Sequence, residues 1–451
     1  MRLNDVVDYF LNRIQNHTSL NAFVQAYPEE ALYKAILLQK RWETEHDMLP
    51  LMGLIVSVKD LIAQRNHQLT AASAILQGYV SPFSATVVRR LEAAGAIIIG
   101  RTNCDEFGMG SSGENSVYGP TFNALDSGLV AGGSSSGAAT SIAADLCHVA
   151  LGTDTGGSVR QPAAFQGLYG YKPTYGRLSR WGVIGYASSM DQVGLLARSP
   201  ELIASVMHLL SLPDERDLHT LRWPAFNMEK VTCEPSIGFD RHLFSSPYVS
   251  LRHEQFWQKI VVTRLAEFAK PIELPGIDEA LGLFHILAPA EAASNLSRYD
   301  GIRYGKSTES ESFQVLVKKN RTVGFGTEVK RRILAGNYFL SAADKPTAYE
   351  KALARRRELI NVYQKIFADT DFLLLPTTYD DAFLPNSKSN NPVDTFEVDK
   401  LLVLSNLIGC AAITVPINQA GRVMPMGLQI LAASGNDEAL LAFANRANEF
   451  F

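Results

Sequence analysis

The stretch LGTDTGGSVRQPAAF, residues 151–165, decides how the rest of the chain is interpreted. Two glycines directly precede Ser158, so their backbone N–H groups are unshielded by side chains and free to point into one concavity, as binding an oxyanion requires. Pro162 suits the first turn of a helix, which places Ser158 just before a helix N-terminus, where partial positive charge favours an anion. A strand-to-helix turn with a solvated serine fits the same residues equally well.

Two further segments carry the same kind of chemistry. The loop VAGGSSSGAAT, residues 130–140, combines bare backbone with hydroxyl groups, and it enters an alanine-rich helix at once, which disfavours a flexible linker. The segment GLIVSVKD, residues 53–60, is an apolar strand that ends in Lys59. A lysine stripped of water has a lowered pKa and can act as a neutral base. A surface lysine at a strand end is the simpler interpretation of this segment alone.

Short apolar runs alternate with helical segments along the whole chain. This alternation predicts an α/β fold with a mixed central β-sheet flanked by α-helices on both faces. The predicted strands lie at residues 54–58, 96–100, 148–152, 372–376, 412–417 and 427–431. Amphipathic helices are predicted at residues 1–14 and 437–451.

One domain is expected over residues 1–451, because neither a linker rich in Pro, Gly or Ser nor an internal repeat divides the chain. The catalytic core is predicted at about residues 50–200 together with the C-terminal strands. Residues 201–345 are more charged and helical, which predicts a helical, lid-like insertion. The polar, proline-punctuated stretch 379–394 is typical of a surface loop.

Composition excludes several classes of protein. Hydrophobic residues make up 46% of the 451 residues, so a large buried core is available. The net charge is −4 without a long basic block, which does not favour direct nucleic-acid binding, and no apolar run reaches the length needed to cross a bilayer. The cysteines are far apart and form no CxxC motif, which fits a reducing compartment and indicates neither a disulfide framework nor a zinc knuckle; they are Cys104, Cys147, Cys233 and Cys410.

The three loops together resemble the amidase signature family, whose catalytic triad is Ser–cis-Ser–Lys. The resemblance implies that Ser158 is the nucleophile, that Ser134 is a bridging serine beside a cis peptide bond, and that Lys59 is the ultimate base. It also implies an oxyanion hole made by the backbone N–H groups of Thr155, Gly156, Gly157 and Ser158. The GxSxG pattern at residues 133–137 also fits the nucleophile elbow of α/β-hydrolases, but that motif requires a hydrophobic strand just before it.

Further segments resemble one subgroup of this family, the glutaminase subunits of tRNA-dependent amidotransferases; they are residues 105–123, 157–183, 294–305 and 328–341. In that subgroup an arginine and an aspartate hold the α-carboxylate and the α-amino group of glutamine, and by position these resemble Arg332 and Asp399. Charge-assisted hydrogen bonds to its anionic and its cationic group would distinguish an amino acid from a plain amide. A helix-face arginine and a solvated helix acid are the simpler interpretations.

The resemblance implies hydrolysis of glutamine to glutamate, with the ammonia supplied for conversion of Glu-tRNA(Gln) to Gln-tRNA(Gln). The implied partners are an amidotransferase B-type subunit together with a small C-type or equivalent subunit, with tRNA contacted mainly through the partner and no membrane. No cofactor is expected in this chain: it has no GxxxxGK[ST] loop, so ATP and Mg belong to the partner, and no HxxH spacing suggests a metal. The expected compartment is the cytoplasm or, alternatively, the mitochondrial matrix. A free-standing amidase acting on another carboxamide and a catalytically silent scaffold are the alternatives.

The chain departs from the family pattern in three places. Ser136 stands where the family commonly has a glycine, and we expect this change to be tolerated because Gly137 follows. Residues 213–290 are shorter and less similar than the pattern, and Phe284 and His285 stand where a tyrosine pair is expected. That region is expected to shape the glutamine pocket or the exit of ammonia.

Overall fold

The structure is a computed structural model that describes residues 2–228, 235–260, 264–310, 312–341, 346–388, 397–417 and 424–450. Its strands form one eleven-stranded sheet in the order β1-β3-β2-β4-β6-β5-β10-β11-β9-β7-β8. The predicted mixed sheet is therefore confirmed. The strands are β1 (Phe23–Ala26), β2 (Ile55–Lys59), β3 (Ile97–Thr102), β4 (Val149–Asp154), β5 (Tyr169–Lys172), β6 (Gln192–Ala197), β7 (Ile237–Phe239), β8 (Ala269–Pro271), β9 (Phe372–Pro376), β10 (Ala411–Ile417) and β11 (Met426–Ala432).

The strands β3, β2 and β4 run parallel, whereas those from β4 through β6, β5, β10 and β11 to β9 pair antiparallel. Every residue of β2 and of β4 is buried, as expected for parallel strands covered on both faces. The carboxyl ends of parallel strands meet at one edge of a sheet. Lys59, the last residue of β2, and Asp154, the last of β4, therefore lie at the same edge.

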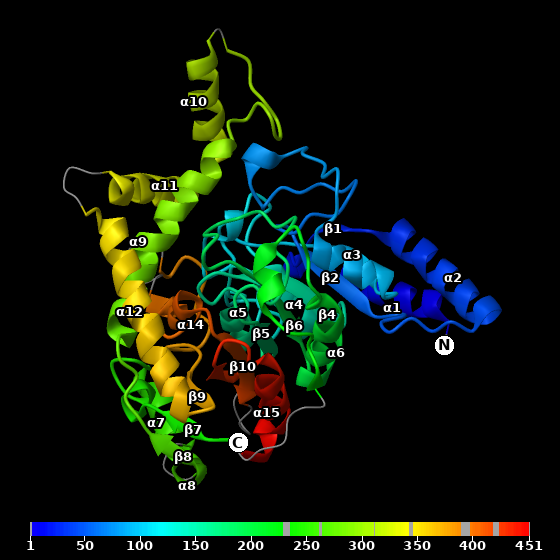
Figure 1. The fold of residues 1–451 in the computed structure, drawn as a ribbon. Helices are drawn as coiled ribbons and strands as arrows, with labels where there is room; N and C mark the ends of the chain where they lie inside the picture. The colour runs from blue at the N-terminus through cyan, green and yellow to red at the C-terminus, as the bar shows by residue number, and fades with distance from the viewer. Residues whose placement is uncertain are drawn as a thin grey trace.

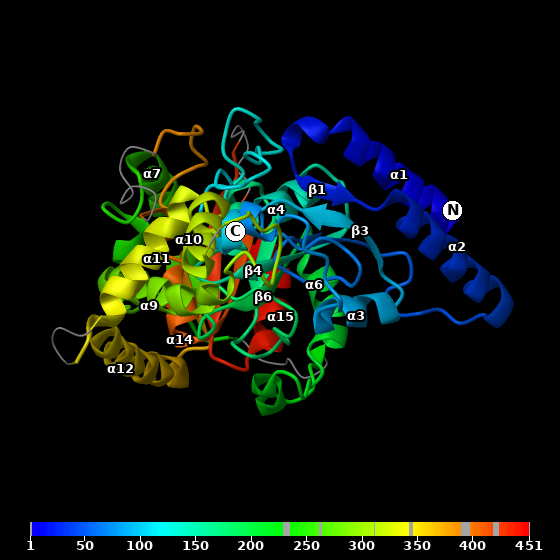
Figure 2. The same ribbon diagram turned by 90° about the horizontal axis from the view of Figure 1, so that it is seen from above.

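Helices cover both faces of the sheet (Figures 1 and 2). Val56 and Val58 of β2 join the core beneath α3, α6 and α15, whereas Ile55 joins the core beneath α1, α2 and α4. On that second face, α9, α11, α12 and α14 cover the half of the sheet formed by β9, β10 and β11. The helices are α1 (Leu3–Asn16), α2 (Pro28–Glu45), α3 (Thr86–Ala93), α4 (Ser136–Ala143), α5 (Arg160–Phe165), α6 (Pro200–Leu210), α7 (Leu251–Ile260), α8 (Ala266–Phe268), α9 (Ile277–Asn295), α10 (Phe313–Gly324), α11 (Thr327–Leu340), α12 (Ala348–Asp369), α14 (Val403–Ile408) and α15 (Asp437–Phe450).

The two predicted terminal helices are confirmed as α1 and α15. The insertion predicted as helical at about residues 201–345 contains mostly helices, and the two short strands β7 and β8 also lie within it and extend the central sheet beyond β9. Each of these strands has only three residues, too few to show a strand period in the sequence. The loop predicted at 379–394 contains no helix or strand at residues 379–388, and residues 389–394 lie outside the described ranges.

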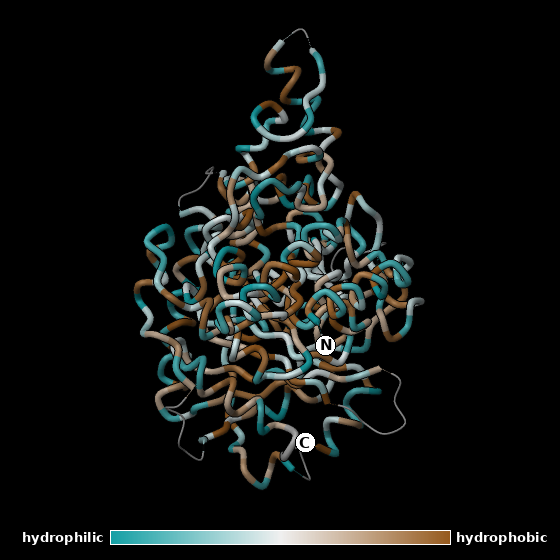
Figure 3. The backbone as a smooth tube through the Cα atoms, turned by 90° about the vertical axis from the view of Figure 1, so that its right-hand side faces the viewer, coloured by the Kyte–Doolittle hydropathy of each residue, from teal (hydrophilic) through white to brown (hydrophobic). Residues whose placement is uncertain are grey.

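Hydrophobic segments gather in the interior of the molecule and hydrophilic ones at its periphery (Figure 3). The helix α10 projects from the body at the top of Figure 1. None of the described helices has the length and apolarity needed to cross a membrane. The described cysteines are free and buried; they are Cys104, Cys147 and Cys410, whereas Cys233 lies outside the described ranges.

The start of α4 is pressed against the ends of β1 and β3. A Cβ atom at Gly137 would lie 2.2 Å from the carbonyl oxygen of Ala22 and 2.7 Å from the backbone nitrogen of Asn103. These backbone atoms belong to the chain just before β1 and just after β3, so they cannot move away as a flexible side chain would. The close packing therefore fixes where the serine-rich loop before α4 meets the sheet.

We expect Gly137→Ala to lower the free energy of unfolding by about 1–3 kcal/mol, because the added methyl group overpacks this contact. Gly282→Ala is the matched control, since Gly282 lies in α9 and a Cβ there meets nothing within 4 Å. That control should leave stability unchanged or raise it by up to about 1 kcal/mol. Urea unfolding of both variants measures the difference, and equal stability of the two would contradict the packing argument.

Candidate active site

Lys59 lies fully buried at the carboxyl end of β2, where sequence analysis placed it. Its Nζ atom donates hydrogen bonds to Ser134 Oγ at 2.8 Å and to Ser135 Oγ at 2.9 Å, and it lies 3.5 Å from the carbonyl oxygen of Thr153. Burial lowers the pKa of Lys59 to about 8, although nearby acids counteract this shift. The amine therefore loses its proton at a pH only slightly above neutral.

The loop before α4 brings Ser134 to this lysine. The peptide bond between Gly133 and Ser134 is cis, as the family resemblance implied for one side of this serine. Asp105 packs so closely against the loop that a Cβ atom at Gly133 would lie 2.1 Å from its Oδ2 atom. The backbone N–H of Asp105 also donates to the carbonyl of Ser134 at 3.2 Å. A side chain at position 133 would thus push Ser134 away from Lys59.

Ser136, the departure from the family glycine, is accommodated by a second glycine. A Cβ atom at Gly113 would lie 2.5 Å from the Cβ atom of Ser136, so the serine occupies space that a side chain at 113 would need. The Ser136 hydroxyl donates to Thr121 Oγ1 at 3.1 Å. The serine therefore fits the first turn of α4 with its polar group satisfied.

Ser158 lies four residues beyond β4 and two residues before α5. Its carbonyl accepts a hydrogen bond from the N–H of Ser135 at 3.0 Å, which joins the two serine-bearing loops. The Ser158 hydroxyl is half-buried and forms no hydrogen bond within the described ranges. It is thus exposed enough to meet a substrate.

A buried ion pair shapes the loop around Ser158. Asp154 accepts hydrogen bonds from the N–H groups of Gly157 at 2.9 Å and Val159 at 3.1 Å, and from Arg160 Nη2 at 2.8 Å. Burial alone would raise the pKa of Asp154, but the Arg160 guanidinium outweighs burial and holds it well below its usual range. Arg160 also donates to the Asn406 side chain at 2.6 Å, which ties the loop to α14.

The hydrogen bond from Gly157 to Asp154 corrects one prediction for the oxyanion hole. This N–H is already bonded to a carboxylate, so Gly157 is not an available donor in this geometry. The N–H groups of Gly156 and Ser158 have no acceptor within the described ranges. A Cβ atom at Gly156 would lie 2.6 Å from the ring of Phe284, so this ring covers the bare backbone. Thr155 follows β4 directly and begins the same loop.

Arg332 of α11 and Asp399 lie near each other, although 67 positions separate them in the chain. Arg332 is 8% exposed; its Nε donates to Glu328 Oε1 at 2.6 Å and its Nη1 to the Tyr186 hydroxyl at 2.5 Å. Asp399 is half-buried and accepts from the Ser111 hydroxyl. Burial raises the pKa of Asp399 to about 7, and Ser111 and Arg332 partly offset this rise. Neither residue is a freely solvated helix-face charge.

Sequence analysis missed several residues that build this site. Ser135 contacts Lys59 directly, and Asp191 accepts a hydrogen bond from the Thr155 hydroxyl at 2.7 Å. No sequence motif links Asp191 to residue 155. Ser135 was visible as part of the serine run, but a run of hydroxyls does not show which of them reach the lysine.

One group among the described residues has the spacing of a metal site, and it does not belong to the candidate active site. It consists of His253, Asp380 and Asp381. His253 Nε2 lies 2.9 Å from one oxygen of Asp381, and Arg252 lies 2.9 Å from the other. The contacts of this group are those of an ion-pair cluster.

Comparison with known proteins finds similarity along nearly the whole chain. The sequence profile of the family described as Amidase matches residues 5–441. The A subunit of glutamyl-tRNA(Gln) amidotransferase from Thermus thermophilus is 43% identical over 446 residues, which cover 98% of this chain and 92% of that protein. The solved A subunit of the Thermotoga maritima glutamyl-tRNA(Gln) amidotransferase matches with a TM-score of 0.76 and 30% identity, over 97% of this chain and 90% of that one. A solved amidase matches with a TM-score of 0.82 and 25% identity, over 100% and 96% of the two chains.

The pKa of Lys59 predicts the pH dependence of amide hydrolysis. A base that must be neutral is inactivated by protonation, so kcat/KM should rise about tenfold per pH unit between pH 7 and pH 8 and level off above pH 8. Lys172 is the matched control, because burial also lowers its pKa to about 8 while it lies on β5 and donates to the carbonyl of Cys410. Lys172→Met should keep the profile, whereas Lys59→Met should abolish activity. A wild-type kcat/KM that does not change between pH 6 and pH 9 would exclude Lys59 as the base.

Proposed function

Since the chain belongs to the amidase family, we propose that it is the glutaminase subunit of a tRNA-dependent amidotransferase. It hydrolyses glutamine to glutamate and supplies the ammonia that converts Glu-tRNA(Gln) to Gln-tRNA(Gln). The observation that carries this proposal is that Arg332 and Asp399, two groups of opposite charge, lie within electrostatic range of each other in a chain that also buries Lys59 against Ser134. Such a pair suits a zwitterionic amino acid, which presents one anionic and one cationic end.

The first half-reaction forms an acyl-enzyme. Lys59, as a neutral amine, takes the proton of Ser134 while Ser134 takes the proton of Ser158, and Ser158 Oγ attacks the side-chain carbonyl carbon of glutamine. The backbone N–H groups of Gly156 and Ser158, with that of Thr155, hold the oxyanion that develops. The proton then returns through Ser134 to the leaving nitrogen, the C–N bond breaks, and ammonia departs.

The second half-reaction releases glutamate. Water attacks the ester carbon and gives its proton to Lys59 through the same relay, and the proton is then returned to Ser158 Oγ as the ester bond breaks. Arg332 and Asp399 hold the α-carboxylate and the α-amino group throughout, so the side chain stays aligned with Ser158. Because Asp399 must be ionised to attract an ammonium group, its raised pKa adds to the loss of activity below about pH 7.

The proposal includes partners and a compartment. The relatives are named as subunits of an amidotransferase, which supports an assembly with a B-type subunit together with a small C-type or equivalent subunit. We place ATP, Mg and the main tRNA contacts on the partner, in keeping with the net charge of −4 and the missing phosphate-binding loop. The buried free thiols support a reducing compartment, the cytoplasm or the mitochondrial matrix.

The test is glutamine-dependent amidation of Glu-tRNA(Gln) by the chain purified together with its partner subunits. We expect Ser158→Ala to abolish amidation with glutamine, because no nucleophile remains, while amidation with added ammonium salt persists. Persistence with ammonium shows that the assembly is intact. Glutamine-dependent amidation by the Ser158→Ala assembly would refute the assigned nucleophile, and full activity of the isolated chain on simple carboxamides would instead favour a free-standing amidase.

A further inference from the structure

Tyr186 lies between β5 and β6 and contacts Arg332 in two ways. Its hydroxyl accepts a hydrogen bond from Arg332 Nη1 at 2.5 Å, and its ring centroid lies 5.6 Å from the guanidinium carbon. The tyrosine is 4% exposed. Together with the bond from Arg332 Nε to Glu328, these contacts fix the plane of the guanidinium group from two sides.

The backbone of Tyr186 is held by the catalytic loop. Its N–H donates to Asp191 Oδ2 at 2.9 Å, and the Thr155 hydroxyl donates to the other oxygen of Asp191 at 2.7 Å. Asp191 therefore joins the residue that begins the Ser158 loop to the residue that touches Arg332.

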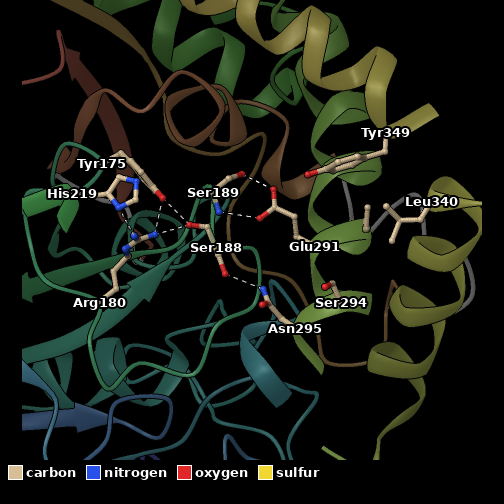
Figure 4. A pocket seen from close by; sticks show the side chains of 11 residues that line it. Tyr175, Arg180, Ser188, Ser189, His219, Glu291, Ser294, Asn295, Leu340 and Tyr349 are labelled. Carbon is tan, nitrogen blue, oxygen red and sulfur yellow. Dashed lines mark hydrogen bonds between the residues drawn. The ribbon is translucent and has the colours of Figure 1, made fainter. Parts of the chain in front are cut away.

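The other side of the Tyr186 loop is held by α9. Asn295 donates to the carbonyl of Tyr186 at 3.2 Å and to the Ser188 hydroxyl at 3.0 Å. Ser189 donates twice to Glu291, through its N–H at 2.9 Å and its hydroxyl at 2.5 Å. Figure 4 shows the contacts of the two serines: Ser188 and Ser189 face α9, and Glu291 and Asn295 point toward them from the helix. The loop cannot shift without breaking bonds to both elements.

A phenol suits this position because it orients Arg332 without neutralising it. Burial raises the pKa of Tyr186, so the hydroxyl stays uncharged at neutral pH and adds no further negative charge beside Arg332, which already forms an ion pair with Glu328. The family pattern has a tyrosine pair at positions 284 and 285, but this chain has Phe284 and His285 there, so neither position supplies a phenol. His285 remains uncharged as well, since burial and the neighbouring arginines lower its pKa to about 3.

We propose that Tyr186 is a positioning residue that aims Arg332 at the α-carboxylate, and thereby sets the preference for glutamine over amides without that carboxylate. This inference rests on the proposed glutaminase function. Tyr186 affects substrate binding rather than the chemical step, because it contacts Arg332 and not the reacting atoms. Its loss should therefore appear in KM and in substrate preference.

The test compares Tyr186→Phe with the wild type in the assembly with its partner subunits. We expect KM for glutamine to rise about tenfold with kcat within about twofold, because one charge-assisted hydrogen bond is lost while the ring remains. The inhibition constant of 4-aminobutanamide, which is glutamine without its α-carboxylate, should stay unchanged. Tyr363→Phe is the matched control, since Tyr363 is also buried and its hydroxyl has no hydrogen-bond partner within the described ranges. It should alter neither constant.

Two outcomes would overturn the inference: an unchanged KM for glutamine, or an equal weakening of glutamine and 4-aminobutanamide, which marks a general structural role. Tyr186→Leu removes the ring as well and should raise KM further, again without weakening 4-aminobutanamide. A wild-type assembly that does not hydrolyse glutamine would refute the proposed function itself. Failure of the Tyr186 inference and failure of the proposed function are thus distinguishable, because the effect of Tyr186→Phe is judged only against a wild-type assembly that hydrolyses glutamine.

Discussion

The site depends on burying the amine of Lys59 without a direct carboxylate partner. Within the described residues, no ion pair involves this lysine, and its nearest acceptors are the two serine hydroxyls. Three buried acids, Asp105, Asp154 and Asp191, lie near enough to raise its pKa against the effect of burial. Each acid also binds backbone N–H groups of a different loop. The protonation of the lysine and the shape of the loops therefore depend on the same carboxylates.

Close packing at glycines keeps these loops in place. Gly133 admits Asp105, Gly113 admits Ser136, and Gly156 admits the ring of Phe284. In each case a Cβ atom would come within 2.6 Å of its neighbour, so the missing side chain is what allows the contact. The departure at Ser136 is best understood in this way, because the space it fills is provided by a glycine from another loop.

The resemblance to the amidase family predicted the meeting of Lys59 with Ser134. From its apolar runs the sequence also predicted β2, β3, β4, β9, β10 and β11, but not β5 and β6 in the middle of the sheet. It could not reveal β7 and β8, since a three-residue strand has no measurable period. The roles of Asp191 and Tyr186 were equally hidden, because each depends on tertiary contacts with residues far away in the chain. The engagement of the Gly157 N–H was missed for a different reason: a glycine pair shows that backbone is accessible, but not which way each N–H points.

The parallel pairing of β2 with β4 affects how mutations can change the specificity of the protein. Lys59 ends one of these strands and the Ser158 loop follows the other, so the separation of base and nucleophile is governed by the roughly 4.8 Å spacing of neighbouring strands. Arg332 and Phe284, by contrast, are carried by the helices α11 and α9. Under the proposed function, mutations in those helices can therefore change which amide is accepted while β2 and β4 keep Lys59 and the Ser158 loop at this spacing.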